Sequence, residues 1–154
     1  MTDVIDRPQV QAPKDLIGFL DFYLVKKAPF QIPDAAKEFL VKFGPWIAVF
    51  FLVLSLPVLL VALGLSAFAA PFLLGPGYAA QFGILTIGTI VNFGLMIAAL
   101  PGLFARKMSG WTLVFYGELV MIAAQLLSLN LVSALLGGLI GLYVLFQIRP
   151  LYRA

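Results

Sequence analysis

A long uncharged stretch constrains the fold of this chain more than any other feature. Residues 43–105, 63 in all, contain no Asp, Glu, Lys or Arg, and residues 108–148 contain a single one, Glu118. A transmembrane helix needs about 20 apolar residues, so each stretch has room for two such helices and a connection. With only 11% charged residues, a soluble domain of this size could not cover its surface. The sequence therefore predicts an all-α membrane protein with a bundle of four transmembrane helices.

Turn residues divide the two stretches into individual spans. Gly75, Pro76 and Gly77 separate the first two spans, because Pro fixes φ and Gly permits positive φ. Pro57 lies inside the first span and predicts a kink there. The runs are much longer than the ~10 residues of a barrel strand and do not alternate, which argues against β spans. The expected transmembrane domain covers 46–148, with helices at about 46–70, 78–100, 111–128 and 131–148.

The residues before the first span predict surface helices. Residues 1–13 are polar with two prolines and predict a mobile tail. Within 14–45, apolar residues recur at helical spacing after Lys14, and a second short helix is expected to start at Pro33 and Asp34. We expect both helices to be amphipathic and to lie in the cytoplasmic interface. Two alternatives are that they cap the end of the bundle or that they bind a partner.

The basic residues predict the orientation of the chain. All ten Lys and Arg lie before the first span, in the loop with Arg106 and Lys107, or in the tail 149–154. An even number of spans brings these three segments to one side of the membrane. The positive-inside rule then places both termini in the cytoplasm. We therefore expect a multi-pass protein of a bacterial inner (plasma) membrane, with 149–154 as a cytoplasmic tail.

A polar layer inside the membrane is the candidate site. Glu118 is a functional candidate by default, because a charge at the bilayer centre costs at least ~2.5–3.5 kcal/mol. Ser55, Asn92 and Tyr143 have similar depths on the other three helices. Asn92 is the first choice as a hydrogen-bond partner for Glu118. The layer can be interpreted as a structural clamp between helices or as a proton or ion site.

Small residues on the fourth span predict close helix packing. Ser133, Gly137 and Gly141 recur every four residues, and small residues let helix backbones approach closely. The ridge is expected to pack within one chain, with dimerisation as the alternative.

The composition also excludes several kinds of chemistry. The chain has no Cys and no His, which excludes disulfides, thiolate nucleophiles, His-based triads and zinc sites built on these residues. There is no phosphate-binding loop, nucleophile elbow or carboxylate pair. We therefore predict no catalytic, cofactor-binding or metal residues, no cofactor and no enzymatic activity. The net charge of +3 does not indicate nucleic-acid binding, because the basic residues flank apolar segments.

The central loop carries a resemblance to known proteins. Residues 101–111 read PGLFARKMSGW, and this wording, within the four-span layout, resembles small bacterial inner-membrane proteins of uncharacterised function. The resemblance implies a location in the inner membrane and transfers no catalytic role.

Three functions remain at this point. The first is an accessory or structural membrane component that packs against the bilayer and another membrane protein. The second is a small transporter or channel that uses Glu118 and forms a homo-oligomer. The third, a membrane enzyme, is disfavoured by the missing His and Cys.

Overall fold

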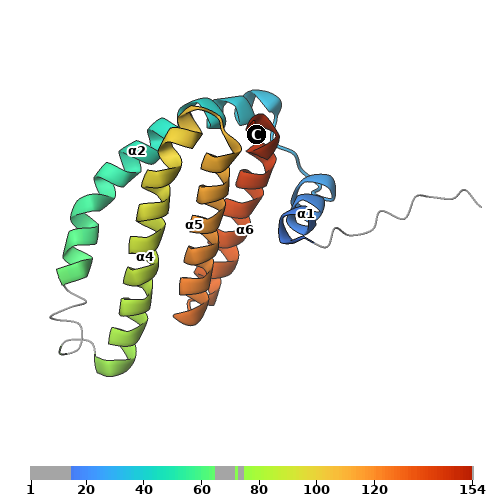
Figure 1. The fold of residues 1–154 in the computed structure, drawn as a ribbon. Helices are drawn as coiled ribbons and strands as arrows, with labels where there is room; N and C mark the ends of the chain where they lie inside the picture. The colour runs from blue at the N-terminus through green and yellow to red at the C-terminus, as the bar shows by residue number, and fades with distance from the viewer. Residues whose placement is uncertain (1–14, 65–71, 73–74, 154) are drawn as a thin grey trace, which may run out of the picture.

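The computed structural model describes residues 15–64, 72 and 75–153, and it is built mainly from helices (Figure 1). Four helices are long and apolar enough to cross a membrane, which confirms the predicted all-α fold with four spans. They are α2 (Asp34–Gly64), α4 (Gly75–Phe104), α5 (Met108–Leu127) and α6 (Leu131–Ile148). The shorter elements are α1 (Leu16–Asp21), the π-helix η1 (Phe22–Lys26) and the 3-10 helix η3 (Arg149–Leu151).

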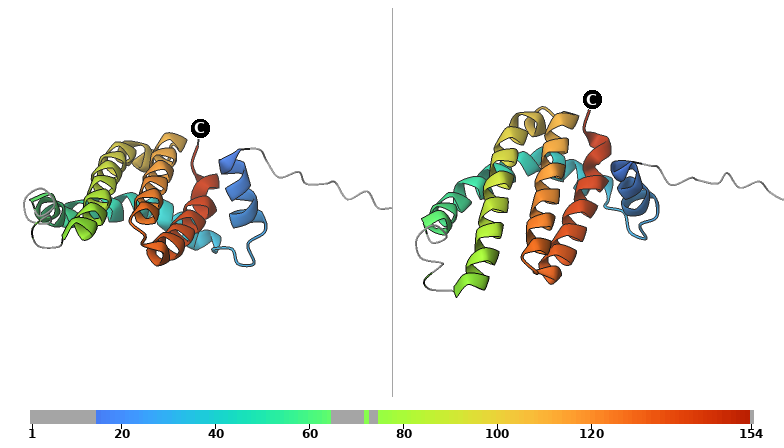
Figure 2. Two further views of the ribbon diagram at one scale, coloured as in Figure 1. Left: turned by 90° about the horizontal axis from the view of Figure 1, so that it is seen from below. Right: turned by 60° about the horizontal axis from the view of Figure 1, so that its bottom comes forward.

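The long helices lie side by side in chain order. Both figures show α4 between α2 and α5, and α5 between α4 and α6, with α1 on the far side of α6 (Figures 1 and 2). The contact between α4 and α5 is the most extensive one, and η1 packs against α6. The first part of α2 crosses the ends of the other helices, and α2 also contacts α6. Each long helix therefore has its sequence neighbours as its main packing partners.

The helix boundaries differ from the sequence prediction at prolines. The predicted boundary between the surface segment 14–45 and a first span that starts at residue 46 is absent, and residues 34–43 form the beginning of α2 instead of a separate surface helix. Similarly, α4 continues through Pro101 to Phe104. A proline removes one backbone hydrogen bond and bends a helix, and neighbouring groups in a membrane protein can compensate for the loss. The fourth span matches its predicted bounds, whereas the tail 1–13 and residues 65–70 lie outside the described residues.

The best-packed part of the molecule lies where the α4–α5 turn meets the C-terminus. The Trp111 ring stacks on Phe115 with centroids 5.4 Å apart, and Phe146 packs edge-on against both rings. The Trp111 indole N–H donates to the Leu145 carbonyl over 2.8 Å. We call this region the packed end; its buried residues are Val41, Ala99, Leu103, Trp111, Phe115, Leu142, Leu145, Phe146, Ile148 and Tyr152.

Backbone and ionic contacts close the packed end. The Arg153 N–H donates to the Arg106 carbonyl over 2.8 Å, and the Met108 N–H donates to the Arg153 carbonyl over 2.6 Å. Arg106 also forms an ion pair with Glu38 on α2 at 2.6 Å. The start of α2 and the C-terminal residues thus hold the same turn, which favours the capping alternative for residues 34–43.

The central part of α2 contrasts with the packed end. No residue in its most apolar 18-residue stretch is buried, whereas the corresponding stretches of α4, α5 and the last span are 17%, 28% and 33% buried. In a bilayer, lipid tails solvate such an apolar surface. This segment of α2 therefore owes its place to the membrane and to a single neighbour, α4.

Candidate functional site

Glycines bring α5 close to its two neighbours. A methyl group added at Gly102 on α4 would lie 2.5 Å from the backbone nitrogen of Gly110 on α5. Further along the same pair, a methyl group at Gly88 would lie 2.6 Å from the Ala124 side chain. Small residues such as Gly and Ala allow helices to approach this closely. The small residues therefore set the position of α5 between α4 and α6.

Glu118 lies on the α6 side of α5. A methyl group added at Gly141 would lie 2.8 Å from the carboxyl carbon of Glu118 and 3.2 Å from its Oε2. The carboxyl group is thus packed on the α6 backbone, where the missing side chain of Gly141 leaves space for it. The side chain is partly buried between two helices that contact each other directly.

Asn92 lies on the other side of α5. Its Oδ1 contacts the backbone at Gly117, the residue directly before Glu118. Asn92 also lines a cavity of about 380 Å³ between α2 and α4, together with Ser55 and Thr89. The structure therefore brings Asn92 and Ser55 together and places Glu118 elsewhere.

A second cavity extends this space along the same pair of helices. It has a volume of about 220 Å³ and shares Ser55, Thr89 and Phe93 with the first. The hydroxyl groups in it are occupied locally: Ser55 donates to the Leu52 carbonyl over 2.9 Å, and Thr89 donates to the Leu85 carbonyl over 2.8 Å. We call the two cavities together the α2–α4 groove.

The predicted polar layer is thus divided into three places. Ser55 and Asn92 share the α2–α4 groove, Glu118 packs on Gly141, and the Tyr143 hydroxyl donates to the Phe30 carbonyl at the N-terminal segment. Among the described residues, no hydrogen bond joins Glu118 to Asn92. Matched depth along the membrane determines the level of a side chain but does not determine which way it points around the helix axis.

The packing ridge on α6 is shifted by one residue from the predicted one. Ser133 and Gly137 are exposed, and a methyl group at Gly137 would meet nothing within 4 Å. The buried positions are Ala134 and Gly138, and a methyl group at Gly138 would lie 2.8 Å from the Ile122 side chain on α5. Of the three predicted residues, only Gly141 contacts α5. Consecutive small residues, Gly137 and Gly138, made the two registers hard to distinguish by spacing.

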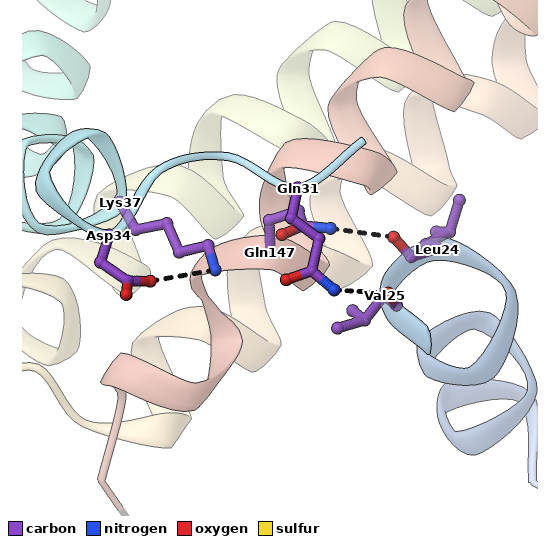
Figure 3. A network of polar contacts seen from close by, with 6 residues as sticks. All are labelled: Leu24, Val25, Gln31, Asp34, Lys37 and Gln147. Atoms are coloured by element: carbon purple, nitrogen blue, oxygen red, sulfur yellow. Dashed lines mark hydrogen bonds and ion pairs between the residues drawn. The ribbon is translucent and has the colours of Figure 1, made fainter. Parts of the chain in front are cut away.

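Sequence reasoning missed the polar residues that tie the N-terminal helices to α6. The Gln147 amide donates to the Leu24 carbonyl on η1 over 3.1 Å, and Gln31 donates to the neighbouring Val25 carbonyl over 3.5 Å (Figure 3). Gln147 is only 1% exposed. A glutamine inside an otherwise apolar span was the signal that could have identified this contact, because buried polar groups require partners.

Arg149 links the same two segments through its charge. It forms an ion pair with Asp21 at 3.3 Å, and its guanidinium lies 5.3 Å from the centre of the Trp111 ring. Arginine stacks well on aromatic faces because the ring face is electron-rich. This side chain therefore connects α1, η3 and the packed end.

No metal site is formed by the described part of the chain, since no group of three or more Asp or Glu side chains is close enough to hold an ion.

No family model matches the chain, and neither a curated protein nor a solved structure is significantly similar to it. The class of protein follows from the helices alone. Four apolar helices of spanning length make it a multi-pass integral membrane protein.

Proposed function

We propose that the protein is an accessory or structural component of a membrane assembly, with no catalytic step of its own. The observation that supports this role is the unequal packing of α2. Its central part has no buried residue, while its start is tied to the packed end through the Arg106–Glu38 ion pair. A helix that is held at one end and has no buried residue along its central span offers a long surface to another transmembrane helix, and packing drives such association in lipid.

The alternative is a small oligomeric transporter that uses Glu118. A transport path needs polar groups connected through the membrane. In the described residues, Glu118 lies toward α6, whereas Asn92 contacts Gly117 on the opposite side of α5 and Ser55 lies farther away, on α2. This separation supports the accessory role over the transporter.

The mass of the native assembly distinguishes these two roles. We expect extraction in native lipid, without detergent, to yield a complex with a second protein at defined stoichiometry. Leu54 and Val61 lie on one exposed face of α2, so Leu54→Trp with Val61→Trp should release that protein. The matched control, Leu136→Trp on the exposed face of α6, should retain it. A homo-oligomer would support the transporter, and a lone monomer would contradict both roles.

We further propose that the packed end faces the cytoplasm of a bacterial cell, in the inner membrane. In support, Arg106, Lys107, Arg149 and Arg153 gather at this end, where Lys107 pairs with Arg153 along the backbone. Reporter fusions at residue 76 and at the C-terminus should lie on opposite sides of the membrane. The same side for both would contradict the orientation.

A further inference from the structure

An open crevice lies between α6 and the segment formed by η1 and the following loop. Its volume is about 370 Å³, within the ~300–1,000 Å³ range of pockets that hold small organic ligands. The residues that line it are Leu24, Pro29, Phe30, Leu139, Ile140 and Tyr143. Its one side-chain polar group is the Tyr143 hydroxyl, which already donates to the Phe30 carbonyl. The cavity therefore suits a hydrocarbon ligand.

Hydrogen bonds hold the two walls of the crevice in place. Tyr143 and Gln147 lie one turn apart on the same face of α6, and both donate to backbone carbonyls of the N-terminal segment. Figure 3 shows Gln147 directed at the Leu24 carbonyl, beside the Gln31 contact to Val25. The Asp21–Arg149 ion pair fastens the other end of the same segment. The crevice is thus a preformed part of the fold.

Two lysines lie on the chain segment that forms one wall of the crevice. Lys26 and Lys27 fall between the lining residues Leu24 and Pro29, and both are exposed. The Lys27 ammonium lies 5.3 Å from the centre of the Tyr23 ring, and neither lysine forms an ion pair with a described residue. Asp21, the acid that precedes them on the same segment, is occupied by Arg149. This wall of the crevice therefore carries a local positive charge.

We propose that this crevice binds one anionic phospholipid, with an acyl chain in the cavity and the phosphate at Lys26 and Lys27. Leu139 and Ile140 extend the cavity along α6 away from the packed end, and both are largely exposed to the region that lipid tails fill. The cavity is too small for a helix, which is about 10–12 Å across with its side chains. Basic pockets beside transmembrane helices bind anionic headgroups, and the acyl cavity supplies the contacts that two lysines alone would lack.

Native mass spectrometry of the full-length protein tests this site. The protein is delipidated in detergent and titrated with palmitoyl-oleoyl phosphatidylglycerol or with the matching phosphatidylcholine. We expect one phosphatidylglycerol per chain, bound at least tenfold more tightly than phosphatidylcholine. Lys26→Gln with Lys27→Gln should weaken it about 30-fold, because each basic residue contributes about 1 kcal/mol at an anionic surface and 1.4 kcal/mol is tenfold.

Matched variants control for charge and for bulk. Lys42→Gln with Lys107→Gln removes two exposed lysines elsewhere and should leave binding unchanged. Leu139→Trp should obstruct the cavity and weaken binding of both lipids, whereas Leu136→Trp, one turn away and outside the cavity, should not. If Leu139→Trp fails to fold, the comparison of the two double-lysine variants still tests the proposed lipid site.

Three results would overturn the proposal. They are equal affinity for the two lipids, equal loss in the two double-lysine variants, and a protein dimer that forms through α6 without bound lipid. The last result would assign the crevice to a second copy of the chain.

Discussion

The packed end and the α2–α4 groove differ in how side chains meet, and apolar content does not explain the difference, because α2 has the highest mean hydropathy of the four spans, 2.8, and α5 the lowest, 1.4. At the packed end, Trp111, Phe115 and Phe146 are each at most 1% exposed, and their rings contact one another. Along the groove, α2 and α4 leave cavities of about 380 and 220 Å³, and the central α2 residues are not buried. Apolar composition inserts a helix into a membrane, but complementary shape is needed to pack it against another helix.

The difference between the two regions follows from the types of residue that each contains. The packed end combines glycines, which let α4 and α5 approach, with large aromatic rings that fill the remaining space. The groove is lined by aromatic rings on both helices and by small residues on α2, among them Ala48, Ser55 and Ala62, and cavities remain between them. Interfaces that interdigitate gain many small dispersion contacts. The groove lacks them and is therefore the deformable side of the molecule.

The largest expected effect is at the closest backbone contact of the packed end. A methyl group at Gly110 would lie 2.5 Å from the Gly102 carbonyl carbon, so Gly110→Leu must separate α4 from α5. We expect a loss of about 3 kcal/mol or more, the upper range for overpacking. Thermal unfolding in detergent, followed by the fluorescence of buried Trp111, measures it. Gly94→Leu, at an exposed position of α4 where an added methyl group meets nothing within 4 Å, is the control, and an equal loss there would show that close backbone approach does not decide stability.

The second largest expected effect concerns the aromatic rings of the packed end. Phe146→Ala removes a ring that is 0% exposed. In water such a change costs about 3–5 kcal/mol, and we expect about 2 kcal/mol here, because lipid can solvate part of the newly exposed apolar surface. Steric trapping or denaturation in sodium dodecyl sulfate gives the free energy of unfolding. Leu135→Ala, exposed on the same helix, should change it by less than about 0.5 kcal/mol; a comparable cost would show that burial does not decide stability here.

A double-mutant cycle tests the position of Glu118. Gly141→Ala should destabilise the protein by about 1–2 kcal/mol, because the new methyl group meets the Glu118 carboxyl group. In the Glu118→Ala background the same change should be nearly neutral, giving a coupling free energy of about 1 kcal/mol. Gly137→Ala, with open space around it, is the matched control. Simple additivity of the two changes would place Glu118 away from α6.

A comparison of two substitutions at Glu118 tests its contact with Gly141 further. Glu118→Gln keeps the shape and should preserve the fold, whereas Glu118→Ala leaves a gap in the α5–α6 interface. If Glu118 binds a proton during transport, Glu118→Gln would also keep the fold but would abolish a proton-coupled flux. An infrared carboxyl band that follows the pH of the surrounding water as that of a free glutamate does would show a water-exposed group and contradict the packing of Glu118 on Gly141.

The smallest effect concerns pH at the packed end. Burial raises the pKa of the Tyr152 phenol above its ordinary value, and the Arg106 charge partly opposes the shift. The unfolded chain therefore ionises first as the pH rises above about 10, so the stability that is present below this pH decreases above it. We expect the thermal midpoint to fall by a few degrees more in the wild type than in Tyr152→Phe. Equal decreases would assign the change to lysine deprotonation.

Much of the site could not be predicted from the sequence, and Asn92 and Glu118 show why. Their similar depths follow from counting residues along each helix, at 1.5 Å per residue. Their directions depend on how each helix is rotated against its neighbours, and the adjacent residues Gly117 and Glu118 face different helices. The choice of Gly138 over Gly137 on α6 has the same origin. Periodicity defines the face of a helix, but the neighbouring helix determines which face is buried.

The sequence by itself determined that the chain crosses a membrane four times, because insertion depends on the local apolar content of each segment. It also placed α6 correctly, since polar turn residues bound that span on both sides. Only the tertiary structure decided that residues 34–43 continue into α2 across the packed end, and that Glu118 rests on Gly141. These outcomes depend on contacts between segments far apart in the chain. Those contacts depend on the shapes of side chains and on how closely two backbones can approach. A hydropathy profile contains neither kind of information.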